Sequence, residues 1–268
     1  MDKGAVENML EKLELILAAP PGDSRAALGF GLTVAHAAYR VGGGPHLYRA
    51  GPPLPVRGGL MALDCAGFDG RGDTGPLCRE ILRECAARGF TGVLCDFEAT
   101  PLPPLVRALQ ALTGPLAKRG WPLYVPEAYG EQVTGARVLI SSALSGGSLV
   151  QRLRDAQEQY GRDRVVLAVE RVAEDFYLPA PQGQGRPLTR EALNALLEER
   201  KPSVFFSGEL CAHYFTYMSR DSGAHFVLFD DAGSIRKKLL TARSLGVSQA
   251  VLSYPQTADL LGEVLRAL

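Results

Sequence analysis

Hydrophobic and polar residues alternate along this chain in two regular ways. Apolar residues three and four positions apart predict amphipathic helices, whereas short apolar runs bounded by Gly, Pro or Asn predict strands. Runs of the second kind predict strands over residues 28–37, 59–67, 91–98, 122–127, 137–143, 164–170 and 249–253. Helical spacing predicts helices over residues 77–88, 105–118, 148–160, 189–199, 234–245 and 257–268. The chain is therefore expected to repeat one strand–helix unit after another.

Three regions depart from this simple alternation. Apolar residues at helical spacing predict an N-terminal helix at about residues 5–18, closed by Pro20-Pro21. Residues 40–57 are rich in Gly and Pro, which favours a loop with one short strand around 46–48, and a second such loop is expected at 177–187. Residues 203–206, 211–218 and 225–229 favour further strands, the last two as a hairpin.

Repeated strand–helix units over about 250 residues predict an α/β protein with a (β/α)8 fold, the TIM barrel. We expect one domain over residues 1–268. A doubly wound open sheet is the alternative, and it usually carries a Gly-rich phosphate-binding turn after its first strand. The only glycine run of that kind, Gly42-Gly43-Gly44, follows no clean strand and opens no helix, so the barrel is favoured.

Composition narrows the class of protein. The chain has 268 residues, 46% of them hydrophobic, and equal numbers of basic and acidic residues, 29 of each. This balance gives no net field that would attract nucleic acid or an anionic membrane. No apolar segment approaches the ~20 residues needed to span a bilayer, and the first residues lack a signal-peptide pattern. We therefore expect a cytoplasmic protein with neither a nucleic-acid nor a membrane partner; the oligomeric state stays open.

Cysteine and histidine usage argues against a metal centre. The chain has an odd number of cysteines and no Cys-x-x-Cys pair. The cysteines are Cys65, Cys78, Cys85, Cys95 and Cys211. Buried free thiols are the favoured interpretation. The four histidines show no spacing typical of metal ligands. We expect no metal and no cofactor.

The strand over 91–98 carries the strongest chemical signal. Alternate side chains of a strand share a face, so Asp96 and Glu98 lie together with Leu94, while Cys95 faces the other way. The two acidic Cα atoms are roughly 6–7 Å apart at about 3.3 Å per residue. Two carboxyls so close do not both ionise cheaply, so one keeps its proton to a higher pH. A proton donor beside an anion is what cleavage of a glycosidic bond requires.

Other polar residues come where predicted strands end. In a barrel these ends meet at one rim, where the function of such folds lies. The rim candidates are Asp64, Glu127, Ser141, Glu170 and Tyr254. Together with Asp96 they form an expected acidic bowl that suits a sugar with many hydroxyl donors. For Asp64, Glu127 and Glu170, helix capping or loop anchoring is the alternative role.

Two motifs resemble a known family. The run Gly92-Val93-Leu94-Cys95-Asp96-Phe97-Glu98 resembles D-G-x-D-x-D-x-E, the signature of glycoside hydrolase family 18, the chitinase-type enzymes. Residues 225–239, HFVLFDDAGSIRKKL, are similar to H-V-V-W-F-E-D-A-R-S-I-x-x-K-L of the bacterial branch linked to spore and cell-wall peptidoglycan. The resemblance covers most of the chain from about Gly59 onward.

The resemblance implies a barrel enzyme that acts on N-acetylhexosamine glycans with help from the substrate itself. Glu98 matches the general acid that protonates the leaving oxygen. Asp96 matches the carboxylate that holds the acetamido N–H, so that the acetamido oxygen attacks the anomeric carbon. No protein nucleophile is then needed, which is an exception to the two-carboxylate scheme. The spore-linked branch also suggests association with spore layers.

The chain departs from the family pattern at several places. Leu94 stands where an inner aspartate is usual, and the strand over 137–143 lacks the family's tyrosine. The last strand ends in Ser253-Tyr254 where a tryptophan is usual, and Trp121 precedes a strand and so is expected at the opposite rim. Three residues are candidates to replace these groups: Tyr129, Tyr214 and Tyr254.

Three functions remain open, in this order. The first is a hydrolase of peptidoglycan or chitin-type glycans with Glu98 as the acid. The second is a catalytically inactive relative that binds a glycan or a protein. The third is a retaining glycosidase that uses Glu98 and Glu170 as two carboxylates about 5 Å apart.

Overall fold

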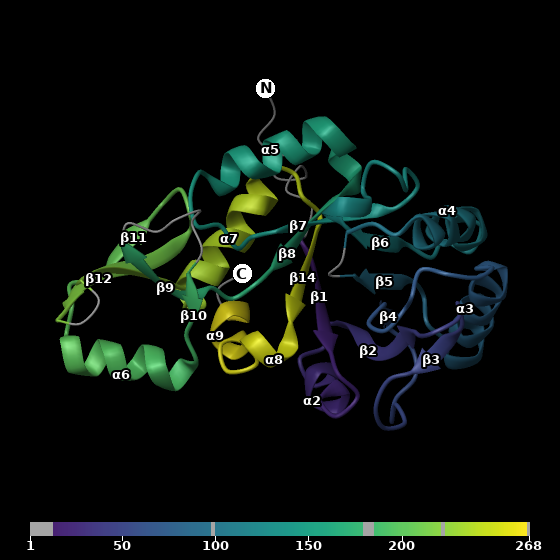
Figure 1. The fold of residues 1–268 in the computed structure, drawn as a ribbon, viewed down its shortest axis with the longest axis horizontal. Helices are drawn as coiled ribbons and strands as arrows, with labels where there is room; N and C mark the ends of the chain where they lie inside the picture. Colours follow the sequence, from purple (N-terminus) through teal and green to yellow (C-terminus); the bar gives the residue numbers. More distant parts are fainter. Residues whose placement is uncertain (1–12, 98–99, 179–184, 221–222, 267–268) are drawn as a thin grey trace, which may run out of the picture.

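The computed structural model describes residues 13–97, 100–178, 185–220 and 223–266. Its main feature is a closed barrel of parallel strands (Figure 1). Around the barrel these strands are β1 (Glu14–Ala19), β2 (Thr33–Val41), β4 (Leu60–Asp64), β5 (Val93–Asp96), β6 (Leu123–Pro126), β7 (Arg137–Ser141), β8 (Val165–Val169) and β14 (Gln249–Ser253). Strand β1 pairs in parallel with both β14 and β2, which closes the wall. The predicted (β/α)8 barrel is confirmed, and the open sheet is excluded.

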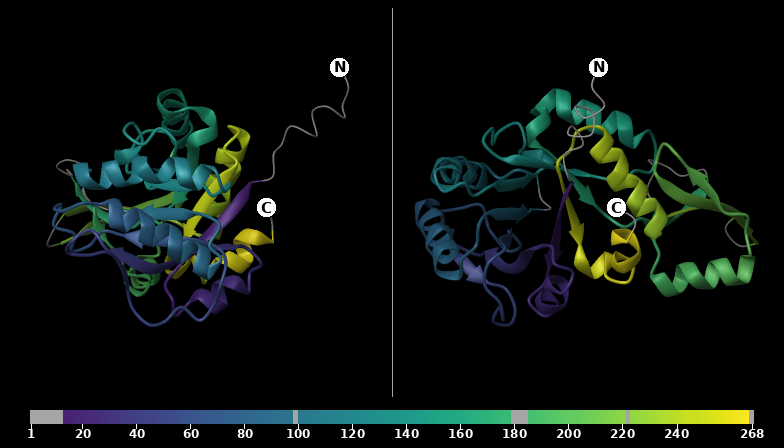
Figure 2. Two further views of the ribbon diagram at one scale, coloured as in Figure 1. Left: turned by 90° about the vertical axis from the view of Figure 1, so that its right-hand side faces the viewer. Right: turned by 180° about the vertical axis from the view of Figure 1, so that it is seen from behind.

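Helices surround the barrel on its outside, as both views of Figure 2 show. They are α2 (Ser24–Leu28), α3 (Gly75–Arg88), α4 (Pro103–Ala117), α5 (Leu149–Tyr160), α7 (Ala232–Ser244), α8 (Tyr254–Thr257) and α9 (Leu261–Leu265). Short 3-10 turns cover Glu127–Tyr129 and Arg162–Arg164, and β3 (Leu47–Arg49) pairs antiparallel with β2. Within the described residues, no helix has both the length and the hydropathy to cross a bilayer.

Strand alternation divides the core into two shells. Leu60 and Ala62 of β4 belong to the small cluster inside the barrel, whereas Met61 and Leu63 pack outward against the helices. Because parallel barrel strands are buried on both faces, their sequences are continuously apolar. Full burial of a side chain such as Leu63 contributes about 1.5–3 kcal/mol, so both shells stabilise the barrel.

The N-terminal end of the barrel interior is filled by polar side chains. The Tyr124 hydroxyl donates to Gln249 Oε1 at 3.0 Å, and Gln249 Nε2 donates to Glu14 Oε2 at 2.5 Å. Arg137 Nη1 donates to the same Tyr124 hydroxyl at 3.2 Å. This network fills the N-terminal end of the barrel, below the apolar interior.

An antiparallel sheet is inserted between β8 and α7. It contains β9 (Ala173–Leu178), β10 (Arg186–Pro187), β11 (Phe205–Ser207), β12 (Ala212–Ser219) and β13 (Gly223–Phe229), in the order β10-β9-β13-β12-β11. Helix α6 (Arg190–Arg200) covers one face, where Leu193 packs on Phe215 and Val227. Figure 1 shows this sheet projecting to the side of the barrel.

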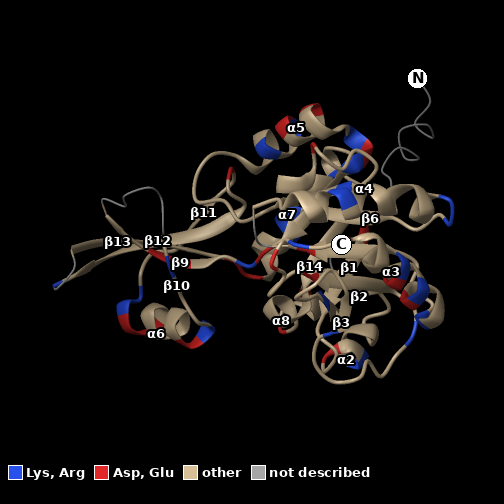
Figure 3. Cartoon of the chain, turned by 45° about the vertical axis from the view of Figure 1, so that its right-hand side comes forward, with Lys and Arg blue, Asp and Glu red and all other residues tan. Residues whose placement is uncertain are grey.

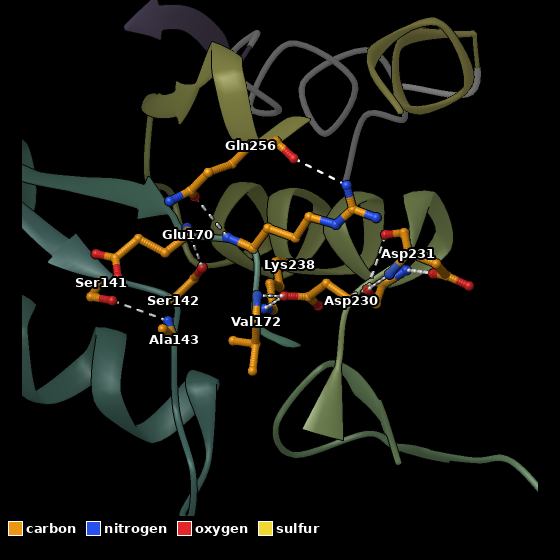
Figure 4. A network of polar contacts seen from close by, with 11 residues as sticks. Ser141, Ser142, Ala143, Glu170, Val172, Asp230, Asp231, Lys238 and Gln256 are labelled. Atoms are coloured by element: carbon orange, nitrogen blue, oxygen red, sulfur yellow. Dashed lines mark hydrogen bonds and ion pairs between the residues drawn. The ribbon is translucent and has the colours of Figure 1, made fainter. Parts of the chain in front are cut away.

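Residues 225–239, which carry the second sequence motif, join the inserted sheet to the barrel. Asp231 caps α7, since its carboxylate accepts from Ser234 N at 2.8 Å and Ser234 Oγ accepts from Asp231 N at 2.9 Å. Asp230, almost fully buried, accepts from Lys238 Nζ at 2.5 Å and from Val172 N at 2.9 Å (Figure 4). The motif therefore holds the C-terminal end of β13 against the segment that follows β8.

The predicted N-terminal helix at residues 5–18 is wrong where the structure describes it. Residues 14–19 form β1, and residues 1–12 lie outside the described part of the chain. The run Leu15-Ile16-Leu17-Ala18-Ala19 is continuously apolar, and such a run fits a strand buried on both faces as well as a helix. Pairing with β14 and β2 decided between the two.

Other expected elements were displaced. The strand expected at 28–37 begins later, as β2, and is preceded by α2. The helix expected at 257–268 is replaced by the short helices α8 and α9, and part of the loop expected at 177–187 belongs to β9 and β10. The strands expected between 203 and 229 lie in the inserted sheet, not in the barrel wall.

Candidate functional site

A cavity of about 470 Å³ opens at the C-terminal ends of β2, β4 and β5. Its lining residues are Arg40, Asp64, Cys65, Ala66, Gly67, Phe68, Asp96 and Leu102. A second cavity of about 430 Å³, lined by Leu13, Leu32 and Arg243 among others, lies at the opposite end of β1. Barrel chemistry takes place at the C-terminal end, so the first cavity is the candidate site.

Asp64 and Asp96 meet at this cavity, as the sequence predicted for strand ends. Asp64 is the last residue of β4 and Asp96 the last of β5, and they are Cα partners in the parallel pairing. Asp96 is exposed and follows Leu94, which is buried inside the barrel. Glu98, the predicted acid, lies outside the described residues. The structure thus brings one predicted catalytic residue and one predicted binding residue to the same cavity.

The predicted orientation of Cys95 is confirmed. Its side chain packs in the outer shell with Phe97, on the face opposite Leu94. Desolvation by burial raises the pKa of this thiol, and the neighbouring Cys65 and Asp96 add to the effect. Burial likewise raises the pKa of Cys85 to about 12. None of the five cysteines forms a disulfide, and Cys85 and Cys95 are neutral at physiological pH.

Arg40 is a residue of the cavity that the sequence analysis missed. Its guanidinium donates to both Asp64 oxygens, from Nε at 2.7 Å and from an Nη nitrogen at 3.2 Å. Strict alternation from Ala35, which faces inward, would place Arg40 outside the barrel, but the β2–β4 register shifts between Ala37 and Tyr39. This irregularity turns Arg40 inward. Because the shift is a relation between two strands, the sequence of β2 alone carried no signal for it.

Ser141 and Glu170 lie at the ends of the adjacent strands β7 and β8. Ser141 Oγ accepts from Ala143 N at 3.1 Å, and the buried Ser142 Oγ accepts from Glu170 N at 3.2 Å (Figure 4). The Ser142 hydroxyl thereby fixes the backbone at Glu170, whose side chain is exposed. These two predicted binding residues are at the barrel mouth, separated from the β4 and β5 ends by β6.

Glu127 and Tyr254 are turned away from the mouth. The Glu127 carboxylate forms an ion pair with Arg152 of α5. Tyr254 begins α8 and packs edge-on against Phe30, with ring centres 6.2 Å apart. Both contacts lie in the helix layer outside the strands. Two of the acids expected in the bowl, Asp64 and Glu127, are thus each paired with an arginine.

Two further candidates, Tyr129 and Tyr214, and the tryptophan Trp121 are not among the residues that line the β4–β5 cavity. Tyr129 is fully buried in the outer shell, against Phe97. Tyr214 lies on β12, where its ring stacks between Phe205 and Phe226 at 5.6 and 5.3 Å. Trp121 precedes β6 at the N-terminal end of the barrel, as expected from the sequence. Tyr129 and Tyr214 therefore pack against other aromatic rings and do not replace a family residue at the β4–β5 cavity.

Charges elsewhere show no other obvious centre. Figure 3 shows both signs interspersed on the helices, whereas β12 and β13 carry few charges along most of their length. Among the residues that the structure describes, no group of three or more His, Cys, Asp or Glu side chains has the arrangement of a metal site. The cavity with Arg40, Asp64 and Asp96 therefore remains the candidate centre.

Comparisons place this geometry among known folds. No family model matches the sequence. The chain is similar to the chitinase of Chromobacterium violaceum, with a TM-score of 0.71 and 15% identity, over 95% of this chain and 98% of that one. It is also similar to the spore cortex-lytic enzyme SleL of Bacillus cereus, with a TM-score of 0.66 and 17% identity, over 95% and 75% of the two chains.

A third structure is the family 18 N-acetylglucosaminidase of Paenibacillus barengoltzii, with a TM-score of 0.65 and 12% identity. It aligns over 96% of this chain and 100% of that one. The protein therefore has the barrel fold of glycoside hydrolase family 18 enzymes. The spore cortex-lytic enzyme SleL shares this fold, in line with the resemblance found in the sequence.

Proposed function

We propose that this protein is a glycoside hydrolase of N-acetylhexosamine-containing glycans, of the peptidoglycan or chitin type. The observation that carries the proposal is Asp96, which ends β5 at the cavity of a barrel shared with chitinases and spore cortex-lytic enzymes. Glu98 follows two residues later in the sequence motif. The cavity volume of about 470 Å³ is in the range of small-molecule sites.

In the proposed reaction the substrate supplies its own nucleophile. Asp96 accepts a hydrogen bond from the acetamido N–H, which directs the acetamido oxygen to the anomeric carbon. That bond forms as the bond to the leaving oxygen breaks, and Glu98 donates its proton to this oxygen. Water then opens the cyclic intermediate, and Glu98 takes a proton from the water. Every proton given by Glu98 is thereby returned.

The first test is hydrolysis of fluorogenic N-acetylglucosamine oligomers and of purified peptidoglycan. Removal of a general acid costs roughly 10²–10⁴-fold in rate, so Glu98→Gln should lose most of the turnover while glycan binding persists. Glu80→Gln is the control, because Glu80 lies on α3, bonded to His46 and the Leu47 backbone. Equal turnover of wild type and Glu98→Gln would contradict the assignment of the acid.

A binding protein without turnover is the second candidate, and specific residues favour it. Leu94 occupies the place of an acid below Asp96, and Tyr254 packs against Phe30 instead of lining the mouth. This function predicts retained glycan or protein binding with no hydrolysis by wild type.

A two-carboxylate mechanism is favoured only by the exposed Glu170 at the end of β8. It requires Glu170 as nucleophile, so Glu170→Gln would abolish turnover as completely as Glu98→Gln. It also requires no 2-acetamido group on the substrate. Tight binding of a thiazoline mimic of the cyclic intermediate would instead support the substrate-assisted reaction.

A further inference from the structure

Three charged residues occupy one level of the barrel wall at the candidate site. Arg40 on β2 is the Cα partner of Asp64 on β4, and Asp64 is the Cα partner of Asp96 on β5. Neighbouring strands lie about 4.8 Å apart, so the order along this level is cation, anion, anion. All three residues line the same cavity.

The middle residue of this row is held by several donors. Arg40 binds Asp64 through two parallel N–H···O contacts, at 2.7 and 3.2 Å, which fixes the plane of the carboxylate. Asp64 Oδ1 also accepts from Ala66 N at 2.9 Å. The orientation of Asp64 next to Asp96 is therefore determined by the guanidinium and by the loop after β4.

Stability alone does not explain this pair. Its two side chains are 45% and 32% exposed, and ion pairs with that much solvent contribute little to folding. The register shift in β2 places the Arg40 guanidinium at the cavity that Asp64 and Asp96 also line.

The strand that carries Asp96 provides no ionisable neighbour below it. Leu94, two residues earlier on the same face, is buried in the apolar interior. On the β6 side the inward residue at the strand end is Pro126. Among the described residues, the ionisable groups at the cavity are Arg40, Asp64, Cys65 and Asp96 itself. Asp64 is thus the acid that β4 places beside Asp96 in the barrel wall, and Glu98 follows Asp96 by two residues in the sequence.

We propose that Arg40 and Asp64 are a positioning pair for Asp96: Arg40 fixes Asp64, and together they set the orientation and the protonation of Asp96. Neither residue is a proton donor to the substrate in this proposal. The inference rests on the proposed function for its effect on turnover, while its effect on Asp96 is independent of any activity.

The proposal predicts opposite effects for the two halves of the pair. Arg40→Gln leaves the Asp64 charge uncompensated beside Asp96, so the pKa of Asp96 should rise by about one pH unit. Asp64→Asn removes the like charge and leaves the cation, so the pKa of Asp96 should fall by about as much. Arg40→Lys keeps the charge and should restore a value near that of wild type.

The measurement is a 13C NMR titration of aspartate carboxyls in the protein of residues 1–268, with Asp96 assigned through Asp96→Asn. Arg152→Gln is the control, because Arg152 pairs with Glu127 in the helix layer and should leave Asp96 unchanged. Circular dichroism confirms that each variant is folded. An Asp96 midpoint that stays constant, or that moves in the same direction in both charge variants, would overturn the proposal.

Turnover provides a separate readout. In an active enzyme, Arg40→Gln should lower kcat about tenfold with little change in KM, because its effect reaches the substrate through Asp96. A raised KM with unchanged kcat would show that Arg40 binds the glycan directly and would overturn the positioning role. If wild type has no turnover, the hydrolase proposal fails while the titration still decides the role of the pair.

Discussion

The imidazole of His36 is fully buried, with Nδ1 3.0 Å from Ser24 Oγ. Burial lowers the pKa of His36 from 6.5 to about 4, because the charged imidazolium is desolvated, and the nearby Arg88 also lowers it. Between pH 6.5 and about pH 4 the imidazole is therefore neutral in the folded state and protonated in the unfolded chain.

This difference predicts a pH-dependent free energy of unfolding. The full stability is present above pH 6.5 and is lost as the pH falls toward 4, since only the unfolded state gains the proton. The loss should reach about 3 kcal/mol. Urea unfolding at pH 7.0 and 4.5 measures it. His36→Gln should flatten this part of the profile, and an unchanged slope in that variant would contradict the prediction.

Single positions also decide which side chains reach the barrel mouth. Glu127 follows the inward Pro126 by one residue, and Tyr254 follows Ser253 by one residue. Both residues lie just past their strands, at the first position of a 3-10 turn and of α8, where the chain has left the barrel wall. This is why Glu127 meets Arg152 and Tyr254 meets Phe30 in the outer layer.

At the scale of elements, the first two turns of α7 hold the inserted sheet to the barrel. Asp230 and Lys238 form an ion pair that is almost completely buried, and Val172 N donates to the same carboxylate. The second motif of the sequence thus contains residues whose contacts are structural. The motif that resembles the spore-linked branch therefore holds the inserted sheet against the barrel, and its described contacts lie away from the cavity.

Breaking that ion pair should be costly. Lys238→Met leaves the Asp230 charge buried without its cation, so we expect a loss of about 3–5 kcal/mol in the free energy of unfolding. Asp231→Ala, which removes only the α7 cap, should cost about 1 kcal/mol. Urea unfolding of both variants measures the two effects. Similar small losses would mean that the buried pair tolerates an uncompensated charge.

At the scale of the whole molecule, β1 is the strand that closes the barrel. It connects β14, near the C-terminus, to β2, near the N-terminus, and Leu17 at its centre is fully buried. Closure therefore depends on residues that are distant in sequence, and the stability of the barrel should depend on this short segment.

Leu17→Ala tests this dependence. A large-to-small change in the core costs about 2–5 kcal/mol, and the whole barrel should lose this stability in one transition. Leu178→Ala in the inserted sheet is a matched control, because Leu178 is 41% exposed and should change stability by less than about 0.5 kcal/mol. Equal effects of the two substitutions would contradict the role of β1 in closure.

The sequence by itself determined the barrel, because strand–helix alternation and buried strands leave local patterns, and it placed Asp64 and Asp96 at strand ends. Only the tertiary structure decided that residues 14–19 are a strand, because a continuous apolar run suits either element until its neighbours pair with it. It also decided that Arg40 faces the cavity. That depends on a register shift between β2 and β4, which is a relation between strands and leaves no periodic signal in either one.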